Sequence, residues 1–307
     1  MINELKVGDK MNQPVILRLQ KVGVSSNGAP FARGLIEDNS GCIPFVCFEA
    51  GIVEKLRQIE NTKPYVVGGN IDINKFASDM SVQLILQKLE NIGAKDDINH
   101  LMPSGNIDLL AYKDKVDELI KSIKDPGLLK LTQTILSGET YEKFLTNPAG
   151  MRLHHAYVGG LMHHSVCVTK IALALAHTIG SVDRDLILTG ALLHDVGKII
   201  EISSELGYPY TTEGRLLGHI SIFAMQLKET GNKIPELEKE KLDKLLHVVL
   251  SHHGEQEKGS PVACATKEAF IVHYADVIDA IMNQFAGDKK PGSWEFNKMM
   301  QRFIMFE

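Results

Sequence analysis

The first ninety residues alternate apolar and polar positions with the two-residue period of β-strands. The pattern predicts five strands, over residues 15–20, 31–35, 42–48, 65–71 and 82–89. Between the third and fourth strands, Ile52, Val53, Leu56 and Ile59 recur at helical spacing. We therefore expect three strands, a short helix and two further strands, joined by turns such as the one at 38–41.

The rest of the chain has the 3.6-residue period of helices, beyond a polar stretch that Pro103 interrupts. Helices are predicted over 110–123, 163–177, 183–194, 239–253 and 266–285, with a further short helix ending near 137 and another helical run beginning at 219. In the helix over 266–285 we expect Phe270, Tyr274, Val277 and Ile281 to form the packing face.

These elements predict a multi-domain chain. The strand order is that of an OB-fold barrel, so we expect an N-terminal all-β OB-fold domain over residues 1–92. Linker and accessory helices follow over 93–148, and an all-α domain occupies 149–307. A length of 307 residues fits two domains better than one.

Composition narrows the class of protein. The net charge is −5, and residues 1–90 hold equal numbers of acidic and basic side chains, so nucleic acid is not bound by bulk positive charge. The longest apolar run we find, 171–176, is too short to cross a membrane, and the amino terminus is too polar for a secretory signal. The four cysteines form no CxxC pair, and we interpret them as reduced core residues of a cytoplasmic protein.

Histidine is unevenly distributed. Eleven of the 12 histidines lie between His154 and His273. His194 and Asp195 are adjacent at a predicted helix end, where one imidazole and one carboxylate suit a borderline divalent cation. Five further residues at helix ends or edges have the same chemistry: His164, His219, His252, His253 and Asp276. Each alone is compatible with an ordinary polar residue, so their order along the chain is the informative feature.

That order, with the motif ALLHDVGK at 191–198, resembles the HD-domain metal-dependent phosphohydrolases. The chain is also similar, over almost its whole length, to the YhaM family of 3′→5′ exoribonucleases, which join an OB-like barrel to an HD domain. The matching motifs are HHAYVGGLMHHS at 154–165, SHHG at 251–254 and HYADVIDA at 273–280. One departure is His163, where relatives often carry glutamate, and its role stays open.

The resemblance implies a two-metal site. His164, His194 and Asp276 would hold one ion and His219, His252 and His253 the other, with Asp195 bridging both. Two ions about 3.5–4 Å apart activate a water and clamp the attacked phosphate. Lys198 would contact a phosphate oxygen, although a solvated lysine at a helix end is the equal alternative. Imidazole-rich shells favour Mn²⁺, Fe²⁺, Co²⁺ or Ni²⁺ over Mg²⁺, and the family points to two Mn²⁺.

Substrate-binding residues are expected in both domains. OB barrels bind single strands with cations and stacking aromatics, and the candidates in the barrel are Arg18, Lys21, Phe31, Arg33, Lys75 and Phe76. Phe45 and Phe48 are expected in the barrel core. Near the first metal helix, Arg152 and His154 are candidates for phosphate binding, and His155 more often braces such a loop. We interpret His177, His247 and His273 as structural.

The sequence thus predicts a metal-dependent 3′→5′ exoribonuclease that hydrolyses single-stranded RNA to nucleoside monophosphates, with single-stranded DNA left open as a substrate. Two alternatives remain, an HD-type phosphodiesterase or phosphohydrolase of free or cyclic nucleotides and a regulatory nucleic-acid-binding protein. No membrane partner is expected, and a homo-oligomer is left open.

Overall fold

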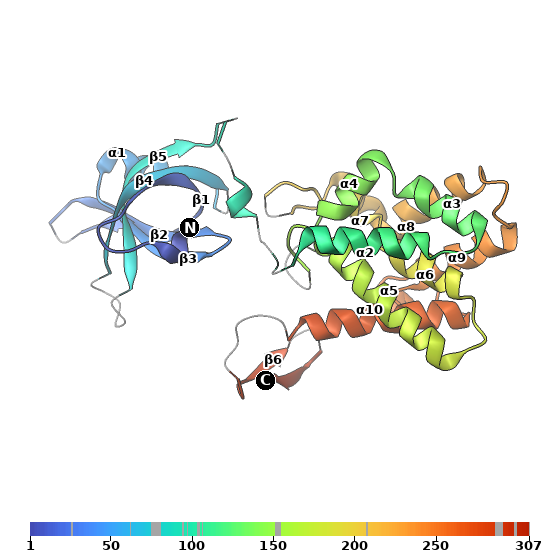
Figure 1. Ribbon diagram of the computed structural model, residues 1–307. Coiled ribbons are helices and arrows are strands. Elements are labelled where there is room, and N and C mark those ends of the chain that lie inside the picture. The colour runs from blue at the N-terminus through green and yellow to red at the C-terminus, as the bar shows by residue number, and fades with distance from the viewer. Residues whose placement is uncertain are drawn as a thin grey trace. The chain divides into compact units, whose positions relative to one another are not determined.

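The computed structural model describes residues 1–25, 27–61, 63–74, 81–93, 95–96, 98–102, 105, 107–150, 155–206, 208–285, 291–297 and 300–306. The chain divides into two compact units. One comprises Met1–Ser104 with Glu205–Pro209, and the other Gly105–Ser204 with Tyr210–Glu307 (Figure 1). Each unit has its own apolar core.

The first unit is a closed five-stranded barrel with strand order β1-β2-β3-β5-β4. Its strands are β1 Lys10–Val24, β2 Pro30–Asp38, β3 Gly41–Cys47, β4 Pro64–Ile73 and β5 Val82–Asn91. The parallel pairing of β3 with β5, at Phe45 opposite Leu84, closes the sheet on itself. This confirms the predicted OB-type barrel, because the strand order and the helix after the third strand are those expected.

Alternation along the strands fills the barrel. Val15 and Leu17 point inward and are fully buried, whereas Arg18 is exposed. Helix α1 (Ala50–Leu56) covers the core with its buried residues Ile52, Val53 and Leu56. Phe45 is buried as predicted, but the expectation for Phe48 is wrong: it follows the end of β3 and is 57% exposed.

The barrel unit extends past the predicted boundary at residue 92. The short 3₁₀ helix Asn99–Leu101 packs against β1 and β2, and a second one, Ile2–Glu4, packs against β3. Nε2 of His100 donates a hydrogen bond to the carbonyl oxygen of Pro14 at 2.9 Å. The carbonyl oxygen of His100 accepts one from the amide of Asn39. Leu101 is buried. Part of the polar stretch predicted as a linker is therefore docked.

The second unit is mainly helical. Its helices are α2 Leu109–Lys121, α3 Pro126–Ile135, α4 Gly138–Thr146, α5 Gly160–Ile179, α6 Arg184–Leu193, α7 Lys198–Glu201, α8 Thr212–Gly231, α9 Lys239–Ser251 and α10 Lys267–Asn283, with a 3₁₀ turn at Gln256–Lys258. Helix α5 packs against both α6 and α10 (Figure 1). No helix in the described part of the chain is both long and apolar enough to cross a membrane.

Two features of this unit and one of the barrel differ from the predictions. A two-stranded antiparallel ribbon, β6 Trp294–Asn297 and β7 Arg302–Met305, follows α10 and was not expected. The packing face of α10 was assigned wrongly: Phe270 and Tyr274 are 46% and 55% exposed, and the buried side carries small or branched residues such as Ala269 and Val272. Among the cysteines, Cys42 of the barrel is exposed rather than in the core.

Candidate metal centre

Seven histidine and aspartate side chains from five helices converge in the second unit. His164 lies on α5, His194 and Asp195 follow the last turn of α6, His219 lies on α8, His252 and His253 follow α9, and Asp276 lies on α10. Four groups of these side chains, or of their neighbours, have potential ligand atoms within 4.8 Å of one another. The structure thus brings together every residue predicted as a metal ligand.

Asp195 lies at the middle of this cluster, and its two carboxylate oxygens face different histidines. Oδ2 is 3.4 Å from Nε2 of His164 and 3.3 Å from Nε2 of His194. Oδ1 is 3.3 Å from Nε2 of His219 and 3.6 Å from Nε2 of His252. A carboxylate with a separate pair of imidazoles at each oxygen has the arrangement of a bridging ligand.

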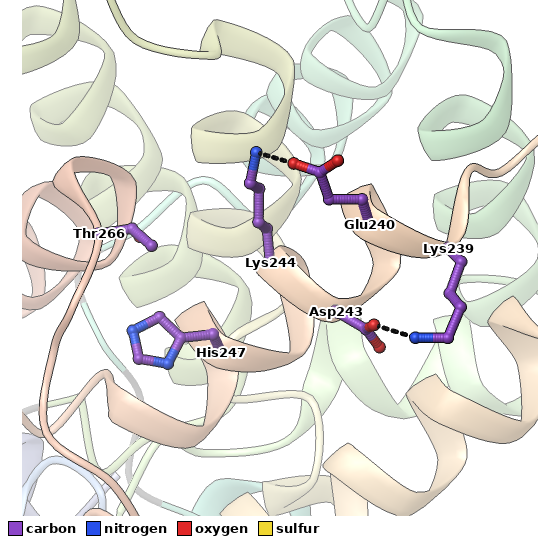
Figure 2. Close-up of a pocket in the computed structure, with 6 residues that line it drawn as sticks. All are labelled: Lys239, Glu240, Asp243, Lys244, His247 and Thr266. Atoms are coloured by element: carbon purple, nitrogen blue, oxygen red, sulfur yellow. Dashed lines mark hydrogen bonds and ion pairs between the residues drawn. The ribbon is translucent and has the colours of Figure 1, made fainter.

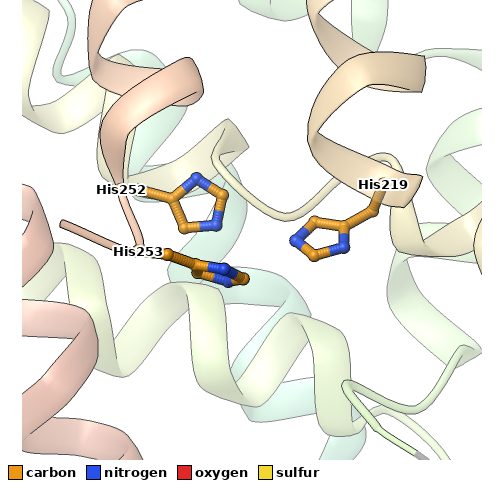
Figure 3. A group of neighbouring side chains, drawn as sticks. All are labelled: His219, His252 and His253. Atoms are coloured by element: carbon orange, nitrogen blue, oxygen red, sulfur yellow. The ribbon is translucent and has the colours of Figure 1, made fainter. Parts of the chain in front are cut away.

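The group of side chains around Oδ2 of Asp195, which holds His164 and His194, also includes Asp276. Its Oδ1 lies 3.2 Å from Nε2 of His164, which in turn is 3.2 Å from Nε2 of His194. The second group consists of His219, His252 and His253, whose rings point toward one another (Figure 3). His253 is the less buried of the last two.

The backbone orients two of the histidines. Nδ1 of His194 donates to the carbonyl oxygen of Ala191 at 2.8 Å, and Nδ1 of His252 donates to that of Val249 at 2.7 Å. Both carbonyl groups belong to the last turn of a helix, where intrahelical partners are lacking. With the proton held on Nδ1, each Nε2 keeps its lone pair directed into the cluster, as metal ligation requires.

Two carboxylates behind the cluster orient two further histidines, and the sequence predictions missed both. Oδ2 of Asp279 accepts from Nδ1 of His164 at 2.7 Å, and Oε2 of Glu201 accepts from Nδ1 of His219 at 3.0 Å. Carboxylate partners of this kind fix the ring and raise its basicity as a ligand. The available signal was spacing, because Asp279 is one helical turn after Asp276.

The centre contains buried polar atoms with no hydrogen-bond partner among the described residues. They are Oδ1 of Asp195, Nε2 of His219 and Nε2 of His252. Each such atom costs free energy on the order of 1–3 kcal/mol when it lacks a partner. A divalent cation would satisfy all three, since each presents a lone pair. The donor set of imidazoles and carboxylates therefore fits a divalent metal.

Electrostatics within the cluster agree with this composition. Burial would raise the pKa of Asp195, but Lys198, His194 and His164 together hold that pKa well below its usual range. Burial lowers the pKa of His252 to about 3. Asp195 is therefore an anion and His252 a neutral imidazole at neutral pH, which are the protonation states that bind a metal ion.

Lys198 lies beside the cluster. Its Nζ is 2.6 Å from Oδ2 of Asp195, and its side chain is only 12% exposed. Gly197 before it has no room for a side chain, because a Cβ atom there would lie 2.1 Å from the carbonyl oxygen of His219. The HDVGK turn and the segment that carries His219 are thereby held in close contact.

The segment around His219 is shaped by Gly218. Helix α8 is interrupted at this glycine, whose backbone angles of φ 71° and ψ 149° are not helical. A positive φ is unfavourable for residues with a side chain, so glycine permits the break. His219 then begins a new helical segment, in agreement with the predicted helix start, and its amide donates to Oε1 of Glu201.

His155 and His163 belong to a hydrogen-bonded chain beside the cluster. Nε2 of His155 is 2.8 Å from Oδ2 of Asp279, the oxygen that also contacts His164. The hydroxyl of Tyr157 lies 2.7 Å from Nδ1 of His155 and 2.5 Å from Nδ1 of His163. His155 thus braces a carboxylate behind the cluster. The predicted substrate residues Arg152 and His154 lie outside the described residues.

The histidines interpreted as structural occupy other positions. Nδ1 of His273 contacts the carbonyl oxygen of His252 at 2.7 Å, and Nε2 of His247 accepts from the amide of Ala265. His177 is exposed at the end of α5. In the described residues, none of them belongs to a group of potential metal ligands.

The predicted nucleic-acid residues of the barrel that the structure describes, Arg18, Lys21, Phe31 and Arg33, lie on strands β1 and β2. Lys21 and Arg33 are exposed and directly opposite each other on β1 and β2. Arg18 instead pairs with Glu37 at 2.6 Å. Phe31 is half-buried, its ring lying over Gly23. Lys75 and Phe76 lie outside the described residues.

A surface pocket on α9 is separate from the cluster. Its lining comprises Lys239, Glu240, Asp243, Lys244, His247 and Thr266 (Figure 2). The charged side chains pair with one another, Lys244 with Glu240 at 2.7 Å and Lys239 with Asp243 at 2.5 Å. The four charged side chains of the pocket therefore neutralise one another, and none of the residues that line it belongs to the cluster.

The segment that carries the cluster matches a known family. Residues 161–281 match the HD domain family. The second unit contains an HD domain. Each cluster residue from His164 to Asp276 falls within the matched segment. The chain therefore joins an OB-type barrel to an HD domain with a buried His/Asp centre of divalent-metal composition.

Solved structures resemble each part of the chain. The SSB domain of a Synechococcus sp. protein is 14% identical over 29% of this chain and 98% of its own, with a TM-score of 0.23. The HD domain of the L. monocytogenes phosphodiesterase PgpH is 21% identical over 50% of this chain and 77% of its own, with a TM-score of 0.33. The same PgpH domain in complex with cyclic-di-AMP gives a TM-score of 0.32.

Proposed function

We propose that this protein is a metal-dependent phosphodiester hydrolase that degrades single-stranded RNA from the 3′ end to nucleoside monophosphates. The observation that carries the proposal is the position of Asp195, which turns one carboxylate oxygen toward His164 and His194 and the other toward His219 and His252. Two-metal centres of this composition are suited to in-line displacement at phosphorus.

Two ions are proposed for the centre. His164, His194 and Asp276 would hold one, His219, His252 and His253 the other, and Asp195 both. Manganese is the proposed metal, because imidazole ligands favour ions of its class over Mg²⁺ and because the YhaM family uses it. When bound, the ions supply a nucleophilic water at neutral pH and compensate charge on the attacked phosphate.

Lys198 is proposed to bind a phosphate oxygen of the substrate. Its ammonium group is already at the cluster, 2.6 Å from Oδ2 of Asp195, and the fields of Asp195, Asp276 and Glu201 keep it charged by raising its pKa against the effect of burial. A permanently charged lysine beside the reacting phosphate stabilises negative charge that develops there.

The barrel is proposed to hold the RNA strand. Lys21 and Arg33 lie directly opposite each other on its outer surface, and two like charges in that position repel unless an anion lies between or above them. A phosphate backbone provides such an anion. The 3′→5′ direction and the monophosphate products rest on the resemblance to the YhaM family.

A product assay tests this function. Single-stranded RNA and DNA, labelled at the 5′ end or uniformly, are incubated with the full chain and Mn²⁺, and the products are resolved. We expect nucleoside monophosphates with progressive shortening of the 5′-labelled strand. The variant His252→Ala should be inactive, whereas His247→Ala, on helix α9 just before His252 but outside the cluster, should remain active.

The same assay separates the alternatives. Intact RNA together with hydrolysis of a cyclic or free nucleotide would identify a nucleotide phosphodiesterase. RNA that is bound in Mn²⁺ but never cleaved would identify a regulatory binding protein. Release of a labelled mononucleotide from the 5′ end would reverse the proposed direction.

A further inference from the structure

Helix α10 exposes a row of large apolar side chains. Phe270, Tyr274, Ile278 and Met282 recur every four residues and are 46%, 55%, 39% and 57% exposed. The remaining exposed residue of this helix, all of which is described, is Lys267 in its first turn. The solvent side of α10 therefore carries no charge from its second turn onward, whereas surface helices ordinarily present polar residues there.

The ribbon that follows α10 has an apolar face of the same kind. Trp294 pairs with Met305 and Phe296 with Phe303, so these four side chains project from one face of the two strands. They are 63%, 40%, 49% and 64% exposed, respectively. Ile304 alternates with them on β7 and is buried, so the opposite face of the ribbon is the packed one.

The ribbon is attached to the end of α10. Nδ2 of Asn297 donates to Oε1 of Gln284 at 3.3 Å, and the rings of Phe285 and Phe306 are 6.1 Å apart. The row on α10 exposes apolar area of about 400 Å², which is as large as the largest patch on a typical monomer. The ribbon contributes a comparable area.

We propose that the row on α10, continued by the exposed face of the ribbon, is the contact surface between two copies of this chain. Together they offer roughly 800 Å² per copy, which is what a stable interface of standard size needs from each partner. The row has i, i+4 spacing, and two such ridges interdigitate at about −50° in the commonest class of helix packing. Because that packing uses the same ridge on both helices, it suits a twofold contact between identical chains.

Charge argues against nucleic acid as the occupant of this surface. Phosphate backbones are bound by lysine and arginine, and the row on α10 offers only Lys267, at one end. A core without charged residues is typical of contacts between protein subunits.

The proposed contact lies on the far side of α10 from the metal centre. Asp276 is about 200° of helix rotation from both Tyr274 and Ile278, and it faces His164. A second copy would therefore pack against the solvent face of α10, whereas Asp276 lies on the opposite face and would not be covered.

Sedimentation velocity of the full chain tests the proposal. At tens of micromolar, we expect twice the mass of one chain for the native protein and for Met225→Lys. The variant Met282→Lys should sediment at half that mass. Met225 is a matched control, because it is 56% exposed on α8 against 57% for Met282, so that neither substitution buries a charge in the monomer.

Disulfide trapping provides a second readout that does not depend on a disruptive substitution. In a Cys42→Ser background, which removes the exposed cysteine, Ile278→Cys should form a covalent dimer under mild oxidation and Met225→Cys should not. A native chain that sediments as a monomer would overturn the proposal. A dimer mass that is unchanged in Met282→Lys would also overturn it. This holds even if that variant loses RNA binding.

Discussion

Oδ2 of Asp279 accepts a hydrogen bond from Nδ1 of His164 at 2.7 Å, and the same oxygen is 2.8 Å from Nε2 of His155. The carboxylate thus fixes the ring whose other nitrogen faces Asp195 and Asp276. Asp279→Asn keeps the shape and removes the charge. We expect the affinity for Mn²⁺, measured by calorimetric titration, to fall about 10- to 100-fold.

High concentrations of Mn²⁺ should restore hydrolysis to Asp279→Asn, because its ligands are intact. Asp276→Asn, one turn away on the same helix, is the control: it changes a proposed ligand directly and should not be restored to the same extent. Equal Mn²⁺ affinity in Asp279→Asn and the native protein would show that Asp279 does not position His164.

Replacing the central carboxylate should have a larger effect. Asp195→Ala removes an oxygen from both proposed metal positions, so we expect hydrolysis of RNA and of a small chromogenic phosphodiester to be lost. The barrel has a separate core and should keep its β-sheet circular dichroism. A variant that retains its native rate with Mn²⁺ present would contradict the metal assignment.

The partner of His219 distinguishes the two proposed ions. Oε2 of Glu201 is 3.0 Å from Nδ1 of His219, and none of the side chains around the first proposed ion contacts Glu201 in the described residues. Glu201→Gln should therefore weaken only the second ion. Elemental analysis after dialysis should give close to one manganese per chain instead of two. Two retained ions, or none, would rule out this division of the ligands.

Mutations in the barrel should raise KM for long RNA more than KM for small substrates. The double variant Lys21→Ala/Arg33→Ala removes two facing cations. For a single strand, the plot of log K against log salt has a negative slope, and each lost phosphate contact makes that slope less steep by about 0.7. We expect KM for long RNA to rise while KM for a chromogenic phosphodiester stays constant. Arg18→Ala is the matched control, because Arg18 already pairs with Glu37. Equal losses on both substrates would contradict this role.

The residues of the proposed ligand set were visible in the sequence because each lies at a helix end or edge. His194 and Asp195 follow one apolar helix, and His252 and His253 follow another. Each pair alone is ambiguous, and it is their order along the chain, with its resemblance to the HD-domain phosphohydrolases, that groups them. The barrel was predictable for a similar reason, since alternation such as that of Val15 and Leu17 reports which face of a strand is buried.

The supporting residues were less accessible to sequence reasoning. Asp279 and Glu201 act through hydrogen bonds to histidines 115 and 18 residues away, and spacing alone does not show such contacts. The face of α10 was misassigned because Phe270 and Tyr274 were expected to be buried like other aromatics. Hydrophobic periodicity locates an apolar face, but it does not show whether that face meets the core or solvent.

Asp125 provides a test of stability remote from the metal centre. Its Oδ1 caps α3 by accepting from the amide of Leu128 at 2.8 Å, and its Oδ2 pairs with Lys241 at 2.6 Å. Burial opposes the charge, but Lys241 and the backbone hold the pKa of Asp125 below its usual value. Asp125→Ala should lower the free energy of unfolding by about 1–2 kcal/mol at pH 7, and Asp125→Asn, which keeps a capping oxygen, by less.

The pH dependence of that difference follows from the sign of the shift. Because the pKa of Asp125 is lower in the folded chain, its ionised form contributes stability above the unfolded pKa of about 3.9, and this contribution is lost as pH falls through the folded value. Urea unfolding of native and Asp125→Asn proteins should therefore show a gap at pH 7 that closes toward pH 3. Hydrolysis should be unchanged in both variants at pH 7, since Asp125 is remote from the metal centre. A difference in the free energy of unfolding that stays constant from pH 7 to pH 3 would mean that the ionic contact with Lys241 contributes nothing.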